Sequence, residues 1–295
     1  MSKPTVVVTG ASGQLGQRVL ELLLERADAP QVIATTRTPA KLEALARRGV
    51  DVRAADFDDE STLVPAFSGA KRALLISTDA LDAPGHRQAQ HARAIRALAR
   101  AGVEHVVYTS LPSPDQSKVL LAPDHAATER EIVASGLDYT FLRNNVYADL
   151  LLGSLPAALA TGQLVDARGN GKVAYVTRDD CARVAAAVVA DFSQTGKHAF
   201  DVTGPDAVSS EDLARIASEV AGRPVRHISV PLAAVIQGMV QHGLPEHVAG
   251  VYASFDTAIA NHELSTVTNT VERFTGRKPQ SLREYLSAQR ARLAA

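Results

Sequence analysis

Residue types that mark secreted, membrane-bound or nucleic-acid-binding proteins are scarce in this chain. Cysteine occurs once in 295 residues, so no internal disulfide can form, and the expected location is a reducing cytoplasm. That residue, Cys181, lies in an apolar helical stretch, where a small buried side chain is more typical than a nucleophile. The net charge of −1 gives no electrostatic reason to expect a nucleic acid or an anionic membrane as partner.

Long apolar runs and metal-binding patterns are also missing. No apolar run approaches the ~20 residues that a membrane-spanning helix needs, and no signal peptide precedes the first predicted strand. The nine histidines include no H-E-x-x-H motif and no two-histidine-plus-carboxylate spacing. We therefore expect neither a metal site nor a membrane segment. Apolar residues make up 46% of the chain, which is enough for a large core.

The first half of the chain alternates strand-like and helix-like patterns, which predicts a parallel sheet with helices on both faces. The first strand ends at Thr9, and the later strands are expected at Gln31–Thr36, Asp51–Ala55, Arg72–Ser77, Glu104–Thr109 and Leu137–Leu142. Right-handed crossovers then give the strand order 3-2-1-4-5-6. The predicted fold class is α/β, a Rossmann-type doubly wound parallel sheet with a smaller, mainly helical C-terminal lobe.

The rhythm of the sequence changes after residue 148. Helical stretches dominate from there, interrupted by strand-like Val173–Thr177 and His198–Thr203. We expect the doubly wound α/β domain to span 1–148 and the smaller lobe to span 149–295. The boundary is soft, because one or both of the late strands can return to the main sheet. The sequence leaves a homodimer open.

Three glycines connect the first strand to the first helix. Gly10 permits the tight turn, Gly13 lets the backbone approach a pyrophosphate, and Gly16 lets the helix pack close to the strand. The amides at the helix N-terminus then face the phosphate charge. A glycine-rich turn that binds nothing is the alternative, but the position at the first strand–helix junction favours a dinucleotide. Its expected contacts are Gly10, Ser12, Gly13, Gln14 and Leu15.

Two further segments at strand ends point to the same ligand. Arg37 ends the second strand, where an NAD-specific site would carry an acidic residue, and its guanidinium can bind the 2′-phosphate of NADP(H). Lys41, one helical turn on, can add charge; the alternative is that both are solvated surface residues. The fourth strand closes with Ile76, Ser77 and Thr78. These residues lie at the switch-point crevice of the sheet, where ribose and pyrophosphate would cross.

With the spacing G-x-x-G-x-x-G and Gln14–Leu15 inside it, the chain resembles the short-chain dehydrogenase/reductase superfamily and, within it, the NmrA-like group. It is similar to the bacterial NADPH:quinone oxidoreductases and triarylmethane-dye reductases over nearly its whole length. The resemblance implies an NADP(H)-dependent oxidoreductase. It also places Asp56 at the edge of the adenine and Phe57 beside it; the alternative is a helix-capping acid and a core aromatic.

The catalytic pair of that superfamily, Tyr-x-x-x-Lys, is missing, because no tyrosine has a lysine four residues later. The corresponding helix carries His125 and Glu129, which share one helical face and match the His-x-x-x-Glu of the quinone and dye reductases. His125 is either a proton donor, since its ordinary pKa suits that task, or part of a structural hydrogen bond with Glu129.

The remaining candidate site residues follow the fifth and sixth strands. Ser110 occupies the position of the superfamily's substrate-facing serine, with a simple turn serine as the alternative. The segment from Leu142 to Tyr147 resembles the Leu-Arg-Asn-x-x-Tyr segment of the quinone and dye reductases. That resemblance implies that the Leu142 backbone and Asn144 line the nicotinamide and that Tyr147 faces the substrate pocket. Taken alone, Tyr147 also fits a core position.

A quinone or a cationic dye accepts hydride readily, because the product is an aromatic hydroquinone or a neutralised cation. The missing proton-donating pair therefore fits such acceptors. We expect an NADPH-dependent enzyme that reduces a quinone-like small molecule mainly by positioning the nicotinamide. Two alternatives stay open: a non-enzymatic NADP(H) sensor of the NmrA type, and an atypical reductase of an imine, an enone, a phenylpropanoid or a dye.

Overall fold

The chain is organised as two compact units that interleave along the sequence. The structure is a computed structural model that describes residues 3–293. The first unit comprises 3–110, 124–143 and 181–200, and the second comprises 111–123, 144–180 and 201–293. A single cut near residue 148 therefore does not separate them. Within 3–293, no helix has the length and apolar character to cross a membrane.

The first unit is built on a seven-stranded sheet with the order β3-β2-β1-β4-β5-β6-β9. Its strands are β1 (Thr5–Val8), β2 (Gln31–Thr36), β3 (Asp51–Ala54), β4 (Arg72–Leu75), β5 (His105–Ser110), β6 (Asp138–Asn144) and β9 (Lys197–Val202). The pairs from β3 to β6 are parallel, with Val7 of β1 opposite Ile33 of β2 and Ala73 of β4. The predicted order 3-2-1-4-5-6 is confirmed, and β9 is the late strand that returns to this sheet.

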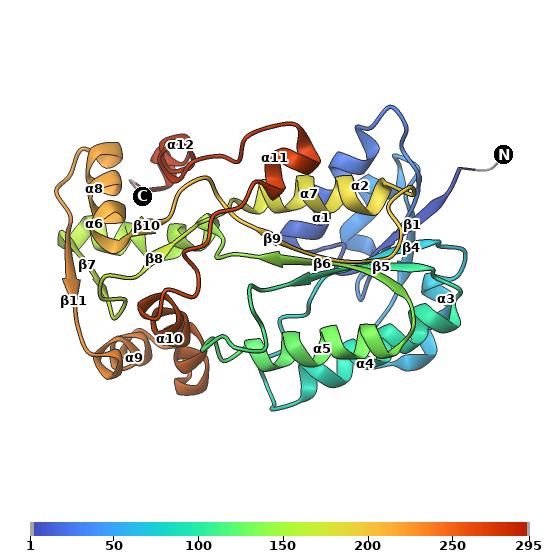
Figure 1. The fold of residues 1–295 in the computed structure, drawn as a ribbon, viewed down its shortest axis with the longest axis horizontal. Coiled ribbons are helices and arrows are strands. Elements are labelled where there is room, and N and C mark those ends of the chain that lie inside the picture. Colours follow the sequence, from blue (N-terminus) through green and yellow to red (C-terminus); the bar gives the residue numbers. More distant parts are fainter. Residues whose placement is uncertain (1–2, 294–295) are drawn as a thin grey trace. The chain divides into compact units, whose positions relative to one another are not determined.

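Helices cover both faces of the sheet. They are α1 (Gln14–Leu24), the 3-10 helix η1 (Pro39–Leu42), α2 (Glu43–Ala46), α3 (Glu60–Phe67), α4 (His86–Arg100), α5 (Ala122–Ala134) and α7 (Arg178–Ala190). Figure 1 shows α4 and α5 on one face and α1 and α7 on the other. One core cluster joins the strands to α3, α4 and α5, through residues such as Val7, Phe67, Leu98 and Ile132. Burial on both faces explains why the central strands β1 and β4 read as mainly apolar runs.

Strand β4 ends at Leu75, two residues before the predicted end at Ser77. Beyond Leu75, the amide of Ile76 donates to the hydroxyl of Thr9, and the amide of Ser77 donates to the hydroxyl of Thr109. Side chains thus replace the backbone acceptors that a continuing ladder would use. The chain leaves the sheet at this point with its amides satisfied.

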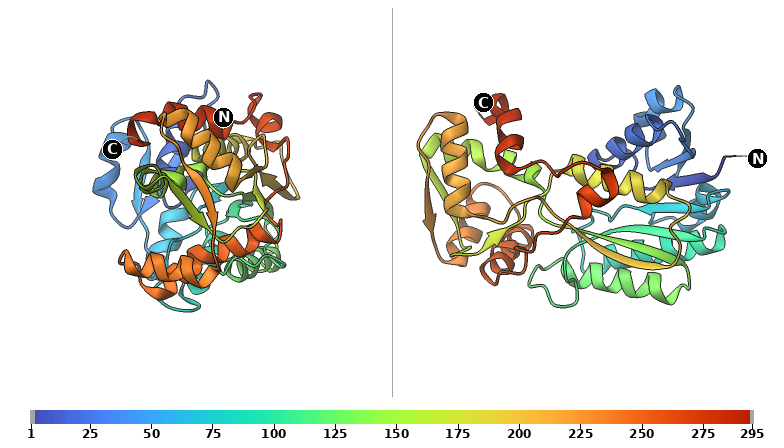
Figure 2. Two further views of the ribbon diagram at one scale, coloured as in Figure 1. Left: turned by 90° about the vertical axis from the view of Figure 1, so that its left-hand side faces the viewer. Right: turned by 45° about the horizontal axis from the view of Figure 1, so that its top comes forward.

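The second unit is mainly helical and holds two small sheets. Its elements are η2 (Ala148–Gly153), α6 (Leu155–Thr161), β7 (Gln163–Asp166), β8 (Lys172–Val173), β10 (Val208–Ser209), α8 (Ser210–Ala221), β11 (Arg226–Ser229), α9 (Leu232–Gln241), α10 (Glu246–Ala260), α11 (Thr270–Thr275), α12 (Leu282–Ala288) and α13 (Arg290–Leu293). β8 is shorter than the predicted strand and pairs with β10 rather than with the main sheet. β7 and β11 pair in parallel, and α8 lies alongside them (Figure 2).

A buried polar network ties the strands and helices of the second unit together. Arg168 Nε donates to Asp256 Oδ1 of α10 at 2.7 Å. Asp166, at the end of β7, accepts from Ser210 Oγ of α8 at 2.6 Å, and its Oδ1 lies 2.8 Å from His227 Nε2 of β11. The side chains of Asp166 and Asp256 are 5% and 6% exposed, so their charges need these partners. Losing one partner of such a buried pair costs about 3–5 kcal/mol.

Helix α1 approaches the turn after β1 so closely that residue 16 has no room for a side chain. A Cβ added at Gly16 would lie 2.4 Å from the Gly10 carbonyl oxygen and 2.9 Å from the Ala11 Cα. By contrast, a Cβ at Gly238 in α9 would meet nothing within 4 Å. The two helical glycines therefore form a matched pair for a stability test.

We expect Gly16→Ala to lower the free energy of unfolding by about 1–3 kcal/mol, because backbone atoms must move to admit the methyl group. Gly238→Ala should raise it by roughly 0.5–1 kcal/mol through the better helix propensity of alanine. Urea unfolding of both variants measures the two effects. A Gly16→Ala protein as stable as the wild type would contradict the close approach.

Candidate functional site

The glycine loop follows β1 and leads directly into α1. Gly10 adopts φ +59°, a conformation that favours glycine, and Gly13 is the N-cap of α1. The loop is tied to the end of β2, because Ser12 Oγ lies 2.9 Å from Thr36 Oγ1. A glycine at the N-cap supplies no capping side chain, so the N-terminus of α1 is suited to an anionic ligand.

Two basic side chains follow Thr36 in the sequence. Arg37 comes directly after β2, and Lys41 lies in η1; both are exposed. Within the part of the chain that the structure describes, neither side chain has a hydrogen-bond or ion-pair partner. An unpaired guanidinium at this strand end can form two hydrogen bonds to a phosphate group.

Asp56 and Phe57 are held by the turn between β3 and α3. Asp56 Oδ1 accepts from the amide of Asp58 at 3.0 Å, and the Asp56 amide donates to Thr62 Oγ1 at 3.0 Å. Asp59, rather than Asp56, is the N-cap of α3. Phe57 is half-buried and packs against the core cluster of the first unit. The adenine contacts expected of this pair stay a prediction.

His125 of α5 is enclosed by α4 and β5, with 6% of its surface exposed. Arg87 Nη2 lies 3.0 Å from His125 Nε2, and Tyr108 Oη lies 2.9 Å from Nδ1. An arginine only donates, so Nε2 is an acceptor and the proton of the neutral ring is on Nδ1, facing Tyr108. Burial, and then the charge of Arg87, hold the pKa of His125 well below its ordinary value. Burial also raises the pKa of Tyr108, whose hydroxyl stays protonated.

Glu129, one helical turn after His125, has other partners. Its Oε1 accepts from Ser110 Oγ at 2.7 Å and from Arg143 Nε at 3.0 Å, and its Oε2 accepts from Arg143 Nη2 at 2.6 Å. Ser110 and Arg143 are opposite each other in the register of β5 and β6, so one carboxylate holds the ends of two neighbouring strands. Among the described contacts, His125 and Glu129 do not bond to each other. The Ser110 hydroxyl donates its proton to Glu129, which leaves its oxygen lone pairs for a ligand.

Asn144 and Tyr147 belong to the second unit and are joined to each other. Asn144 Nδ2 donates to Tyr147 Oη at 3.0 Å, and the Arg178 guanidinium lies 5.2 Å from the centre of the Tyr147 ring. Arg178 is in turn held by Asp149, with 3.0 Å between Nη1 and Oδ1. Asn144 is 9% exposed, and its Oδ1 is buried without a hydrogen-bond partner among the described residues. Such an unpartnered buried acceptor is rare in folded proteins.

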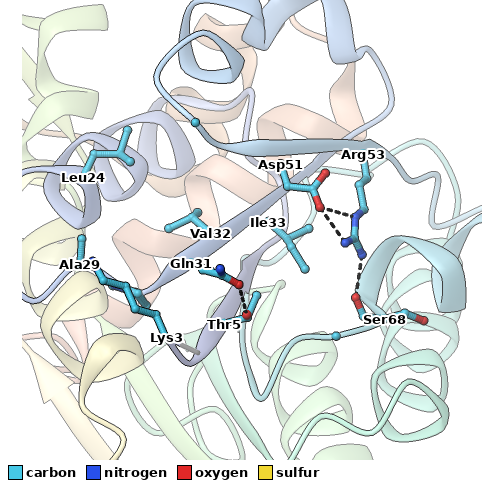
Figure 3. A pocket seen from close by; sticks show the side chains of 13 residues that line it. Lys3, Thr5, Leu24, Ala29, Gln31, Val32, Ile33, Asp51, Arg53 and Ser68 are labelled. Carbon is cyan, nitrogen blue, oxygen red and sulfur yellow. Dashed lines mark hydrogen bonds and ion pairs between the residues drawn. The ribbon is translucent and has the colours of Figure 1, made fainter. Parts of the chain in front are cut away.

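A pocket of about 550 Å³ lies away from these residues, near the amino ends of β1, β2 and β3. Figure 3 shows Arg53 in this pocket, bonded to the carboxylate of Asp51 and to the carbonyl of Ser68. Gln31 and Thr5 are also bonded to each other. Four polar side chains that line the pocket thus bond to other groups of its lining. Within residues 3–293, no group of three histidine, cysteine or acidic side chains could hold a metal ion.

The sequence did not reveal which residues hold His125 and Glu129. Arg87, Tyr108 and Arg143 lie on α4, β5 and β6, and they are 38, 17 and 14 residues away from the side chains that they contact. No local spacing rule connects residues so far apart. The one available signal was Arg143, a charged residue directly after the predicted sixth strand.

Comparisons with known proteins find similarity along nearly the whole chain. The model of the NmrA-like family matches residues 2–286. Quinone oxidoreductase 2 of Escherichia coli (strain K12) is 36% identical over 96% of this chain and 97% of its own length. The NAD(P)H azoreductase of Xenophilus azovorans is 30% identical over 98% of this chain and 99% of its own length.

Two solved structures are similar over nearly their full length. The Escherichia coli NADPH-dependent quinone oxidoreductase complexed with NADPH superposes with a TM-score of 0.91 at 36% identity, covering 96% of this chain and 99% of its own. The triphenylmethane reductase of Citrobacter sp. complexed with NADP(H) has a TM-score of 0.90 at 34% identity, covering 97% of this chain and 99% of its own.

The buried histidines of the first unit predict a loss of stability in acid. The pKa of His91 is lowered from 6.5 to about 3, and that of His125 lies well below 6.5, in both cases mainly through burial. Below that unfolded-state pKa, the unfolded chain binds protons that the folded protein does not, so the free energy of unfolding rises with pH. It should fall by roughly 1.4 kcal/mol per pH unit for each ring as the solution is acidified.

Urea unfolding at several pH values between about 7 and 5 measures this slope. His125→Gln should reduce the slope by the share of one ring, because the amide does not titrate. An identical slope in the variant would contradict the depressed pKa of His125.

Proposed function

The chain belongs to the NmrA-like family, and on that premise we propose that it is an NADPH-dependent reductase that transfers hydride to a quinone or a similar conjugated acceptor. The observation that carries the proposal is the end of β2. Exposed Arg37 stands there without a partner among the described residues, next to a glycine loop tied to Thr36 by Ser12. This is where a 2′-phosphate would be held. The single cysteine supports a cytoplasmic location as part of the same proposal.

The residues present fit the dinucleotide. The N-terminus of α1 after Gly13 suits the pyrophosphate, and Arg37 suits the 2′-phosphate. Two buried oxygens, Thr78 Oγ1 and Asn144 Oδ1, have no partner among the described residues. Asn144 Oδ1 suits the carboxamide N–H of a nicotinamide. Each of these groups is of the polarity that the corresponding part of NADPH requires.

The bound NADPH supplies the hydride, that is, two electrons and one proton. A quinone that accepts it needs one more proton, which water can provide, and the products are a hydroquinone and NADP⁺. The protein then has two tasks. It holds the nicotinamide next to the acceptor, and it keeps water away from the hydride transfer. We propose Ser110 and Tyr147 as residues that face the acceptor.

We propose a structural role for His125 rather than proton donation. Its Nε2 accepts from Arg87 and its Nδ1 proton faces buried Tyr108, so it would need a second proton to act as an acid. The depressed pKa of the ring opposes that step at neutral pH. Glu129 is likewise committed to Ser110 and Arg143.

Oxidation of NADPH in the presence of quinones, dyes, enones and aldehydes tests the proposal directly. Turnover with a quinone at micromolar to millimolar concentration supports it. Turnover with only another acceptor class would replace the quinone by that class. Tight NADPH binding without turnover of any acceptor would overturn the enzymatic proposal in favour of a sensor.

Arg37→Ala should weaken NADPH binding roughly ten- to a hundredfold, because a charged hydrogen-bonded contact contributes about 1.5–3 kcal/mol. NADH binding should barely change, since NADH has no 2′-phosphate. Titration of protein fluorescence with each cofactor measures both affinities. Equal losses for the two cofactors would show that Arg37 acts on the fold rather than on the phosphate.

Asn144→Ala should lower kcat more than His125→Gln does. Without Asn144 the nicotinamide loses an orienting contact, and misplacement by about 1 Å can cost on the order of 100-fold. His125→Gln removes a ring that donates to Tyr108 only and should change kcat by less than tenfold once the folded fraction is measured. A hundredfold or larger loss of kcat in His125→Gln, with NADPH binding intact, would identify His125 as the proton donor.

A further inference from the structure

The chain that leaves β4 is held by side chains from three different elements. The amides of Ile76–Thr78 donate, in chain order, to Thr9 Oγ1, Thr109 Oγ1 and His91 Nε2, at 3.0, 2.9 and 3.0 Å. Thr9 directly follows β1, Thr109 lies near the end of β5, and His91 lies in α4. These three bonds fix the backbone at the edge of the sheet between the two strand ends where a doubly wound fold binds its ligand.

The His91 ring is itself held in one orientation. It is fully buried, with 0% of its surface exposed, and burial together with Arg87 lowers its pKa to about 3. Because the Thr78 amide can only donate, Nε2 is the acceptor. The proton is then on Nδ1, and Nδ1 lies 2.8 Å from Thr128 Oγ1 of α5. The Thr128 hydroxyl donates to the carbonyl of Asp124 at 2.7 Å. The ring also meets the Tyr108 ring edge-on, with 5.8 Å between centres.

We propose that His91 is a positioning residue for NADPH, which acts through the Thr78 amide and touches neither cofactor nor acceptor. The inference rests on the proposed function, because it assumes that Ile76–Thr78 faces the ribose and pyrophosphate. If His91 cannot accept, the Thr78 amide has no hydrogen-bond partner. Of the three bonds that hold Ile76–Thr78, the segment then loses the one whose acceptor lies on a helix. Its side chains then no longer present one fixed surface to the cofactor.

Two substitutions at position 91 separate the acceptor from the packing. The leucine of His91→Leu fills the space of the ring but cannot accept a hydrogen bond from the Thr78 amide. The glutamine of His91→Gln places Oε1, which can accept that bond, near the position of Nε2. We expect His91→Leu to raise the KM and Kd for NADPH on the order of tenfold, the effect of one buried hydrogen bond. At saturating NADPH its kcat should stay within about twofold of the wild type, because the nicotinamide is held elsewhere. His91→Gln should recover most of the affinity. Thr109→Val removes the hydroxyl that accepts from the Ser77 amide, and it should raise the KM for NADPH in the same way.

His105 provides the matched control. It is also a buried histidine of the first unit, 4% exposed, with a pKa lowered to about 4 and one side-chain bond, 2.9 Å between Nε2 and Thr140 Oγ1. It begins β5, at the end of the strand opposite Thr109. His105→Leu should therefore lose stability without losing NADPH affinity. Wild-type affinity in His91→Leu, or an equal loss in His105→Leu, would overturn the proposal.

Amide hydrogen exchange distinguishes this proposal from the proposed function. In the cofactor-free protein, the Thr78 amide should exchange faster in His91→Leu than in the wild type, while the β1 amides stay protected. Unchanged exchange at Thr78 would overturn the tether whatever the protein binds. If His91→Leu shows this exchange pattern but the wild-type protein does not bind NADPH, the tether is present and the proposed function is overturned. The role of His91 in cofactor binding is then overturned with it.

Discussion

The contact between Gly16 and the turn at Gly10 determines how the first helix meets the first strand. With α1 pressed against that turn, its N-terminus stands directly beside the end of β1. The bond between Ser12 and Thr36 then extends the same loop to β2, and Arg37 follows at once. One tight approach thus places an uncapped helix end and an unpaired guanidinium along one edge of the sheet. Both groups attract anions, and no acidic side chain occurs in the first turn of α1 to oppose them.

Helix α5 shows how differently two residues four positions apart can be used. His125 is kept neutral in a buried cluster with Arg87 and Tyr108, whereas the carboxylate of Glu129 is bonded to Arg143 and Ser110. In both cases the polar groups are occupied by the protein itself. These contacts support the structural role that we propose for His125. Such a site suits acceptors that need little help with protons.

The sequence predicted the features that depend on local spacing. The glycine triplet, the end of β2 at Thr36 and the strand order follow from short-range patterns, and the structure confirms the order. It could not predict that β4 stops at Leu75, because the acceptors Thr9 and Thr109 come from strands that are distant in sequence. The partners of His125 and Glu129 were missed for the same reason. Long-range polar contacts have no period, and each one depends on the completed fold.

The interleaving of the two units has a consequence for synthesis on the ribosome. Strand β6 ends at Asn144, but its outer neighbour β9 does not begin until Lys197. About fifty residues must therefore be made before that edge is covered, which takes several seconds at ordinary translation rates. During this interval β6 presents an open edge of the kind that pairs with other chains. The nascent protein is most exposed to aggregation in that window, and a chaperone that protects it would need to act before residue 202 has emerged.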